Sequence, residues 1–298
     1  MKNKFRGTIA LLSATVIWGS AFIAQSVGMD YIGPFTFQAI RCLLAVSFLI
    51  IFTFLAERNP AKSVEKWLQP ELWKAGLPCG IALFIAAGLQ QMGIVSTSAG
   101  KAGFITAMYI VLVPILGIFL RKKPPFTAWI GVILAVIGLY MLSCVGVTQV
   151  NIGDLYLLGC ALGYAVQITL VDQMGGELDG FRLNCVQSLI CGVFSAIVML
   201  ITEEPILGNI FACWVPLVYA GVFSLGIAFS LQIIGQKHLE PTPAALIMSL
   251  ESVFAVLFGW LLLHERLSTA EFAGCALVFS AVILSQIPET KKSSDITH

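Results

Sequence analysis

Residues 34–56 decide the fold, because they read PFTFQAIRCLLAVSFLIIFTFLA and contain a single charged side chain, Arg41. A helix of about 20 predominantly apolar residues is long enough to cross the hydrocarbon core of a bilayer. The strands of a membrane barrel alternate apolar and polar residues, whereas this segment is almost continuously apolar. The segment is therefore predicted to be a transmembrane helix.

The composition extends this interpretation to the whole chain. Of the 298 residues, 11% are charged and 58% are hydrophobic. Soluble domains carry roughly 25% charged residues, and a soluble domain of this length could not cover its surface with less than half of that. The composition excludes a soluble enzyme, a nucleic-acid-binding protein and a disordered chain. It indicates an all-α, polytopic membrane protein whose surroundings are the lipid bilayer.

Ten apolar runs of this kind follow one another along the chain. The links between them are short and leave no room for a soluble domain of about 50 residues or more. The predicted transmembrane helices cover Thr8–Val27, Pro34–Ala56, Trp73–Met92, Ala99–Leu120, Phe126–Val145, Gly153–Val171, Phe181–Ile201, Phe211–Ile234, Thr242–Leu263 and Thr269–Ile287. The first run is too long for the ~7–15 residues of a signal-peptide core and is predicted to stay in the mature protein.

The basic residues predict how the helices are oriented. If the N-terminus is cytoplasmic, the inner segments carry most of the Lys and Arg, and the outer segments carry only Lys101 and Arg266. Lys and Arg gather on the cytoplasmic side of membrane proteins. Because the number of predicted helices is even, both termini are expected in the cytoplasm, with the chain in the cell membrane.

The two halves of the sequence are related by an internal repeat. Two constant shifts align Leu89 with Leu231, Gln90 with Gln232, Gly93 with Gly235 and Gly117 with Gly259, and Gly7 with Gly153 and Trp18 with Tyr164. The repeats are predicted to cover residues 1–148 and 149–298. Since each holds an odd number of helices, the copies must have opposite orientations. Inverted repeats of this kind are an architecture of secondary transporters, with substrate bound between the halves near the midplane.

Several motifs resemble the EamA family of the drug/metabolite transporter superfamily. They are Trp18-Gly19-Ser20-Ala21-Phe22, Leu89-Gln90 before Gly93, Ser249-Leu250-Glu251-Ser252-Val253-Phe254-Ala255 and Leu262-Leu263-His264-Glu265-Arg266-Leu267. The chain departs from the family where Ser252 replaces a frequent Pro and where Arg121-Lys122-Lys123 replaces a frequent Glu. The resemblance implies a transporter that exports amino acids or other small metabolites; some members carry drug-like compounds.

Two charged residues are predicted to lie near the middle of the membrane, Arg41 and Glu251. Charge at this depth costs from about 3 to more than 10 kcal/mol, so each is a candidate functional residue. An Arg and a Glu together suit a zwitterionic substrate, but they would suit each other equally well as a structural ion pair. A carboxyl group in a cavity of low dielectric constant favours its neutral form, so Glu251 could also exchange a proton during transport. Lys101 lies nearer a helix end and is expected to reach outward.

Two polar stripes suggest which helix faces line the substrate site. Asn184, Gln187, Ser188 and Cys191 share one helix face, and the repeat places Gln38, Arg41, Cys42 and Ala45 at the corresponding positions. The stripes would serve a midplane site, although hydrogen bonds that only join the helices would explain each residue alone.

Aromatic and amide side chains complete the predicted pocket. Trp18, Phe22 and Gln25 share a face, Tyr164 and Gln167 echo them, and Tyr109 takes the repeat position of Glu251. Aromatic walls with a few amides suit a metabolite pocket, whereas ordinary packing is the alternative for each ring. The candidate substrate-binding residues are Arg41, Glu251, Gln38, Asn184, Gln187, Gln90, Gln232, Trp18, Phe22, Tyr109, Tyr164 and Gln167.

No pattern in the sequence indicates a cofactor, a metal or a catalytic residue. The eight cysteines lie in apolar stretches without a metal-binding spacing, and the chain lacks an ATP-binding G-x-x-x-x-G-K-[ST] loop. A membrane enzyme acting on lipid phosphates would gather acidic residues at one face, whereas the acids here are scattered. The chain is predicted to be a secondary transporter that exports amino acids or similar metabolites, with a proton link possible. A carrier of drugs or lipophilic cations, or a metabolite exchanger, is the alternative; a monomer and a homodimer are both open.

Overall fold

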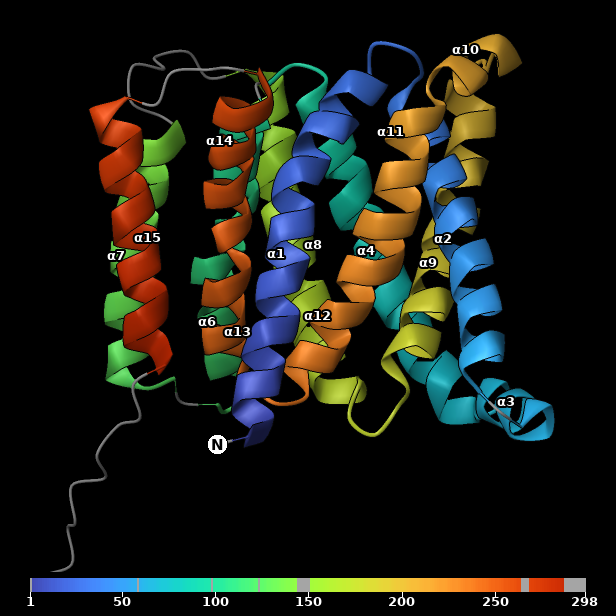
Figure 1. Cartoon of the computed structure of the whole chain (residues 1–298), viewed down its shortest axis with the longest axis horizontal. Helices are drawn as coiled ribbons and strands as arrows, with labels where there is room; N and C mark the ends of the chain where they lie inside the picture. The colour runs from blue at the N-terminus through green and yellow to red at the C-terminus, as the bar shows by residue number, and fades with distance from the viewer. Residues whose placement is uncertain are drawn as a thin grey trace, which may run out of the picture.

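The computed structural model describes residues 2–57, 59–97, 99–122, 124–143, 151–263 and 268–286. Within these ranges every regular element is a helix, and most of them run side by side as one bundle (Figure 1). The longest are α1 (Lys2–Gly28), α2 (Pro34–Ala56), α4 (Pro70–Ile94), α8 (Ile152–Met174) and α9 (Gly180–Thr202). The all-helical prediction is confirmed for this part of the chain.

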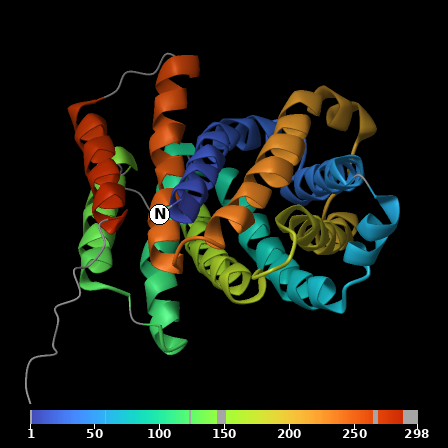
Figure 2. The same ribbon diagram turned by 60° about the horizontal axis from the view of Figure 1, so that its bottom comes forward.

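Eight helical segments are long and apolar enough to cross a membrane, so the protein is a multi-pass membrane protein. The runs predicted to be the fifth and tenth crossings form the shorter apolar helices α7 (Phe126–Ser143) and α15 (Thr269–Gln286). These two helices pack against each other at one edge of the bundle (Figures 1 and 2). The motif at residues 264–267 and the C-terminal tail lie outside the described residues.

Two of the predicted continuous helices are interrupted near their middles. The fourth consists of α5 (Ala99–Thr106) and α6 (Tyr109–Phe119), and the ninth consists of α13 (Pro241–Met248) and α14 (Leu250–Leu263). At the interruptions some hydrogen bonds span three residues instead of four, as in the bonds from Met108 N to Ile105 O and from Ser252 N to Ser249 O. The tighter turns start a new half-helix at the middle of each segment, which the uniform apolar pattern of the sequence did not reveal.

The predicted eighth helix is also irregular. It is built from α11 (Trp214–Val218), a π-helical segment η1 (Tyr219–Ala228) and α12 (Phe229–Gln236), and the short α10 (Leu207–Ala212) precedes it. π-helical turns are rare and frequently occur at functional sites. The predicted link before α4 contains one further helix, α3 (Pro60–Trp67), whose first turn is capped by the side chain of Asn59.

Close helix contacts hold the centre of the bundle together. α4 packs against α8 and α9, α1 packs against α12 and α14, and α2 packs against α9. Glycine permits the closest of these contacts, because a Cβ atom at Gly19 would lie 2.5 Å from the Cβ of Phe254 in α14. A Cβ atom at Gly76 would likewise lie 2.3 Å from a methyl carbon of Val186 in α9. α1, α2, α4 and α9 are thereby held around the middle of the bundle.

The antiparallel helices α2 and α9 are tied together at both ends by glutamates. At the end of α9, the Glu203 carboxylate accepts hydrogen bonds from the backbone N–H groups of Phe35 and Thr36, each at 2.8 Å, and from Thr36 Oγ1 at 2.7 Å. These bonds satisfy N–H groups that the first turn of α2 would otherwise leave unpaired. A carboxylate at a helix N-terminus also interacts favourably with the helix dipole.

At the end of α2, Glu57 makes the corresponding contact. Its carboxylate accepts a 2.5 Å hydrogen bond from Lys66 in α3 and lies 3.8 Å from the guanidinium of Arg182, which belongs to the first turn of α9. The hydrogen bond from Lys66 lowers the pKa of Glu57. Arg182 also donates to Ser63 at 2.9 Å and pairs with Asp179 at 3.0 Å, which fixes α3 against the bundle.

Candidate functional site

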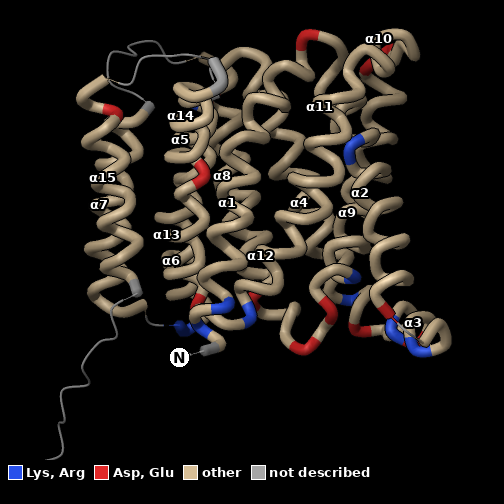
Figure 3. Tube along the Cα trace, viewed as in Figure 1, with Lys and Arg blue, Asp and Glu red and all other residues tan. Residues whose placement is uncertain are grey.

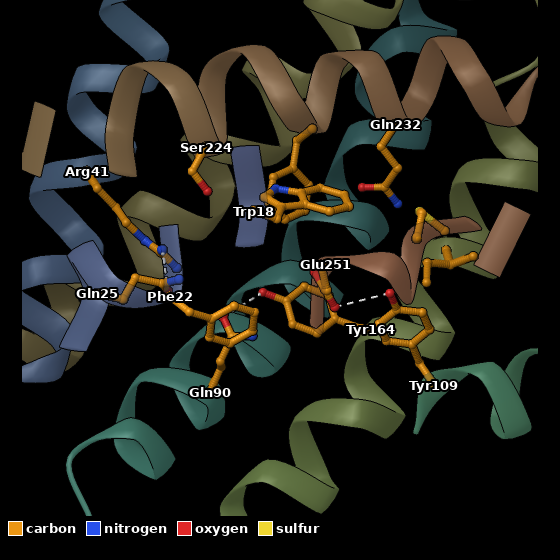
Figure 4. A pocket seen from close by; sticks show the side chains of 13 residues that line it. Trp18, Phe22, Gln25, Arg41, Gln90, Tyr109, Tyr164, Ser224, Gln232 and Glu251 are labelled. Carbon is orange, nitrogen blue, oxygen red and sulfur yellow. Dashed lines mark hydrogen bonds between the residues drawn. The ribbon is translucent and has the colours of Figure 1, made fainter. Parts of the chain in front are cut away.

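A cavity of about 40 Å³ lies among the central helices, and Figure 4 shows the 13 side chains that line it. Its walls come from α1, α2, α4, α6, α8, η1, α12, α13 and α14. Eight of the predicted substrate-binding residues line it, namely Trp18, Phe22, Arg41, Gln90, Tyr109, Tyr164, Gln232 and Glu251. The fold thus brings together residues from both halves of the sequence in one cavity.

Glu251 lies where the two interrupted helices meet. It belongs to the first turn of α14 and is buried, and Tyr109, the first residue of α6, donates a hydrogen bond from Oη to Glu251 Oε1 at 3.1 Å. Beside this pair, Tyr164 Oη donates to Gln90 Oε1 at 3.2 Å. No ion pair involves Glu251 within the described ranges. Its carboxyl group therefore accepts one hydrogen bond from a hydroxyl group and lies at the N-terminal end of α14, where the helix dipole is positive.

Arg41 lines another part of the cavity wall and is 4% exposed. Its Nε donates to Gln38 Oε1 at 2.8 Å and its Nη1 donates to Gln25 Oε1 at 2.9 Å. In the part of the chain that the structure describes, the guanidinium forms no ion pair. Arg41 and Glu251 therefore do not pair with each other in this structure, and both ionisable side chains line the cavity without an ion-pair partner among the described residues.

The other four predicted residues do not line the cavity but lie behind its wall. Gln38 orients Arg41 from the same helix. Gln167, Asn184 and Gln187 belong to a chain of hydrogen-bonded amides that reaches the cavity at Gln232. Their positions were predicted from stripes on helix faces, and those stripes do not distinguish a side chain in the wall from one that supports it.

Five lining residues were not among the predicted site residues: Gln25, Ile168, Ser224, Phe229 and Met248. Gln25 follows Trp18 by seven residues and was visible as part of the aromatic stripe. Phe229 packs edge-on against the Trp18 ring, with the ring centroids 5.0 Å apart. Ser224 belongs to the π-helical segment η1. Its neighbours in the sequence are apolar, and they do not indicate a π-helical turn.

The two faces of the bundle differ. At the face opposite the N-terminus, Lys101 and Asp154 form a 2.6 Å ion pair, with side-chain exposures of 11% and 7%. The expectation that Lys101 reaches outward is therefore wrong, because the carboxylate of Asp154 holds it between α5 and α8. At the N-terminal face, an open cavity of about 870 Å³ lies between the ends of α6, α8 and α12. An ion pair between Lys122 and Asp172, two residues that line this cavity, lies at the same face.

Comparison with known proteins identifies the family. The model of the EamA-like transporter family matches residues 5–144 and again residues 151–286. The chain belongs to the EamA-like transporter family. An uncharacterized transporter of Archaeoglobus fulgidus is 32% identical to this EamA-like protein over 93% of this chain and 84% of the relative. The transporter YoaV of Bacillus subtilis is 21% identical over 93% of this chain and 95% of its own.

Two further similarities are more distant. The WAT1-related protein At3g02690 of Arabidopsis thaliana, described as chloroplastic, is 24% identical over 94% of this chain and 69% of its own length. A protein of known crystal structure has the same fold, with a TM-score of 0.79, 17% sequence identity and coverage of 94% of this chain and 96% of its own. The family and the names of the relatives indicate that this EamA-like protein is a transporter.

Proposed function

We propose that this EamA-like transporter exports zwitterionic metabolites, amino acids foremost, by alternating access around the central cavity. The observation that carries the proposal is the presence of two buried, opposite charges, Arg41 and Glu251, in one cavity wall without ion-pair partners among the described residues. A guanidinium binds a carboxylate through two parallel hydrogen bonds, and a carboxylate binds an ammonium group. An amino acid offers both groups in one molecule.

The energetics favour a ligand that neutralises both residues at once. An unpaired charge at membrane depth is costly, and truncating one partner of a buried charge pair typically costs about 3–5 kcal/mol. A bound zwitterion provides a carboxylate for the Arg41 guanidinium and an ammonium group for the Glu251 carboxylate, which a proton can neutralise when the site is empty. The cavity volume of about 40 Å³ is far below the roughly 300–1,000 Å³ of ligand pockets. Helices must therefore separate to admit a substrate, as alternating access requires.

We propose that the chain crosses the membrane ten times as two inverted five-helix repeats, residues 1–148 and 149–298. The interruptions support this proposal, because the repeat shift that aligns Gln90 with Gln232 also aligns Tyr109, after the first interruption, with Glu251, after the second. Helix contacts correspond as well, since α4 packs on α8 as α12 packs on α1.

Matched glycine contacts give further support to the inverted repeat. A Cβ atom at Gly7 would lie 2.9 Å from Gly235 O, and a Cβ atom at Gly153 would lie 2.8 Å from Gly93 O. The sequence repeat relates Gly7 to Gly153 and Gly93 to Gly235. The two helix crossings are therefore equivalent under the repeat, as a duplicated structure with two opposed copies requires.

We propose that the N-terminal face is cytoplasmic and that the C-terminus is on the same side, with the protein in the cell membrane. In the described ranges, most Lys and Arg lie at the face where the N-terminus lies (Figure 3). With this orientation, the larger cavity lies on the cytoplasmic side and the Lys101–Asp154 ion pair lies on the outer side. Impermeant maleimide added to intact cells should label Asn151→Cys but not Lys62→Cys, with the unchanged chain as the blank. The reverse pattern would contradict the orientation.

A proton link is part of the proposal, because a proton can replace the ammonium group at Glu251 when the site returns empty. The second candidate is a carrier of lipophilic cations, which the aromatic residues Trp18, Phe22 and Phe229 in the cavity wall favour. Against it, the positive charge of Arg41 in the same wall repels a cation.

Transport by purified protein in proteoliposomes tests these alternatives. Amino-acid efflux is expected from vesicles that contain the wild-type protein, and Glu251→Gln should abolish it. Glu71→Gln, at an exposed glutamate in the first turn of α4, should leave efflux intact. A pH gradient should change the efflux rate of the wild-type protein. If cationic dyes move and zwitterions do not, the cation carrier is correct. If efflux requires an amino acid on the opposite side, the protein is an exchanger.

A further inference from the structure

Five amide side chains from α8, α9 and α12 form one continuous hydrogen-bonded chain, and one of its inner members lines the cavity. From one end, Gln187 Nε2 donates to Asn184 Oδ1 at 2.9 Å and Gln167 Nε2 donates to Gln187 Oε1 at 3.2 Å. Gln232 Nε2 then donates to Gln167 Oε1 at 3.0 Å and to Gln236 Oε1 at 2.9 Å. Within this chain, only Gln232 lines the cavity.

Backbone carbonyl groups fix the direction of every amide in this chain. At one end, Gln236 Nε2 donates to Ile168 O at 3.0 Å. At the other end, Asn184 Nδ2 donates to Leu225 O at 2.8 Å and to Gly226 O at 2.9 Å. A carbonyl oxygen can only accept, so the NH₂ groups of Gln236 and Asn184 must point outward along the chain. Their oxygens therefore point inward along the chain and accept hydrogen bonds, that of Gln236 from Gln232 and that of Asn184 from Gln187.

Gln232 is left with one orientation. Both hydrogens of its NH₂ group are used by the two neighbouring oxygens, and turning the amide over would place its oxygen against both of them. The remaining atom, Gln232 Oε1, is buried and has no hydrogen-bond partner. Hydrogen bonds in a chain polarise one another, which makes this oxygen a stronger acceptor. A buried acceptor without a donor is unfavourable, so a bound ligand that donates there gains affinity.

The repeat-related glutamine differs. Gln90 Oε1 accepts from Tyr164 Oη, and Gln90 Nε2 donates to Thr106 Oγ1 at 3.4 Å, so both ends of that amide are occupied. Of this repeat-related pair, Gln232 alone has an unsatisfied acceptor. Figure 4 shows Gln232 and Glu251 on different elements, with both side chains directed toward the space beside Trp18.

We propose that Gln232 Oε1 and the Glu251 carboxylate together select a primary ammonium group, so that the transporter discriminates amino acids from the hydroxy acids of the same shape. This inference rests on the proposed function and names what the Glu251 part of the site recognises. Two acceptors require two N–H or O–H donors. A protonated amine supplies three, whereas a hydroxyl group supplies one and leaves an acceptor unpaired. A site with buried acceptors rejects ligands that cannot satisfy them.

The test compares L-leucine and L-phenylalanine with the 2-hydroxy acids that carry the same side chains, by calorimetric binding to the purified full chain. Wild-type protein should bind each amino acid at least about ten-fold more tightly than its hydroxy acid. Gln232→Leu should weaken the amino acids by about ten-fold and change the hydroxy acids little, which reduces the ratio. Gln90→Leu, at the repeat-related position, should weaken both ligands alike and preserve the ratio.

An unchanged ratio in Gln232→Leu would overturn the inference, as would wild-type protein that binds the hydroxy acids as tightly as the amino acids. If Gln232→Leu does not fold, Gln232→Met keeps the side-chain length without the oxygen and is judged by the same ratio. If wild-type protein binds neither class, the proposed function itself fails, which is a different outcome from a lost ratio.

Discussion

The replacement Arg41→Gln should separate substrate recognition from structural support. Arg41 is 4% exposed and donates to two neutral amide oxygens, but it has no carboxylate partner in the described ranges. Of its five N–H groups, two are used in these bonds, and the others remain for a substrate carboxylate. Two hydrogen bonds involving charged groups are worth about 3 kcal/mol at the low end, which corresponds to about a hundred-fold in affinity.

The same replacement should change the stability of the protein little. The variant loses two hydrogen bonds to Gln38 and Gln25, but it also loses a buried charge that no counter-ion compensates. These effects oppose each other, so the free energy of unfolding should shift by less than about 1 kcal/mol.

Arg182→Gln is the matched control. Arg182 is 3% exposed, and it bonds to Ser63 and Asp179 instead of facing the central cavity. Because Asp179 is 37% exposed, solvent weakens that pair, and the variant should lose about 1–3 kcal/mol of stability with unchanged substrate affinity.

Calorimetric titration with amino acids and thermal unfolding of the detergent-purified proteins measure the two quantities. Arg41→Gln should lower the affinity for amino acids and preserve the stability of the protein. Arg182→Gln should lower the stability and preserve the affinity. If Arg41→Gln lowers the unfolding temperature as much as Arg182→Gln and leaves the Kd within about three-fold of wild type, Arg41 is a structural residue. The zwitterion site would then be refuted.

Three further predictions concern contacts at the face opposite the N-terminus. Glu203→Ala should lower the free energy of unfolding by about 1–2 kcal/mol, measured by thermal unfolding, because the first turn of α2 loses its cap. Gly153→Val should prevent stable folding, since even a Cβ atom there would lie 2.3 Å from Ser96 Oγ. Gly208→Val is the control and should leave stability unchanged, because a Cβ atom at that position meets nothing within 4 Å. Asp154→Asn should weaken the contact between α5 and α8, so that the thiol of a Thr97→Cys variant reacts faster with impermeant reagents; an unchanged rate would show that the Lys101–Asp154 ion pair does not hold these two helices together.

The sequence was sufficient to place most of the cavity wall because the cost of polar groups in a bilayer restricts where they can lie. Arg41 and Glu251 could not face lipid, so they had to face the protein interior. The repeat then identified partners for them, since Gln90 with Gln232 and Trp18 with Tyr164 are pairs that a duplicated cavity would use. These arguments need only hydropathy and spacing, and the sequence contains both.

The details that decide recognition could not be predicted in this way. The interruptions at residues 107–108 and 249 fall in apolar segments without Gly or Pro at those positions, and the propensities of residues such as Ala107 and Met108 favour an unbroken helix. The direction of the Gln232 amide depends on backbone carbonyls of α8 and η1, which are far apart in sequence. Hydropathy distinguishes buried from exposed positions, but it contains no information about which end of an amide is already satisfied.

The proposed inverted repeat places chemically different groups at equivalent positions, and a zwitterion likewise has two unlike ends. In the proposed inverted repeat, the two interrupted helices place equivalent residues opposite each other, yet the residues at those positions are a phenol, Tyr109, and a carboxyl group, Glu251. Arg41 likewise has the amide of Gln187 as its repeat equivalent. A cavity with two-fold symmetric chemistry would bind an amino acid equally well in two opposite directions. Because one copy of each of these positions is neutral, the proposed site would distinguish the carboxylate end of a zwitterion from its ammonium end, and the proposed repeat would keep the symmetry that alternating access needs.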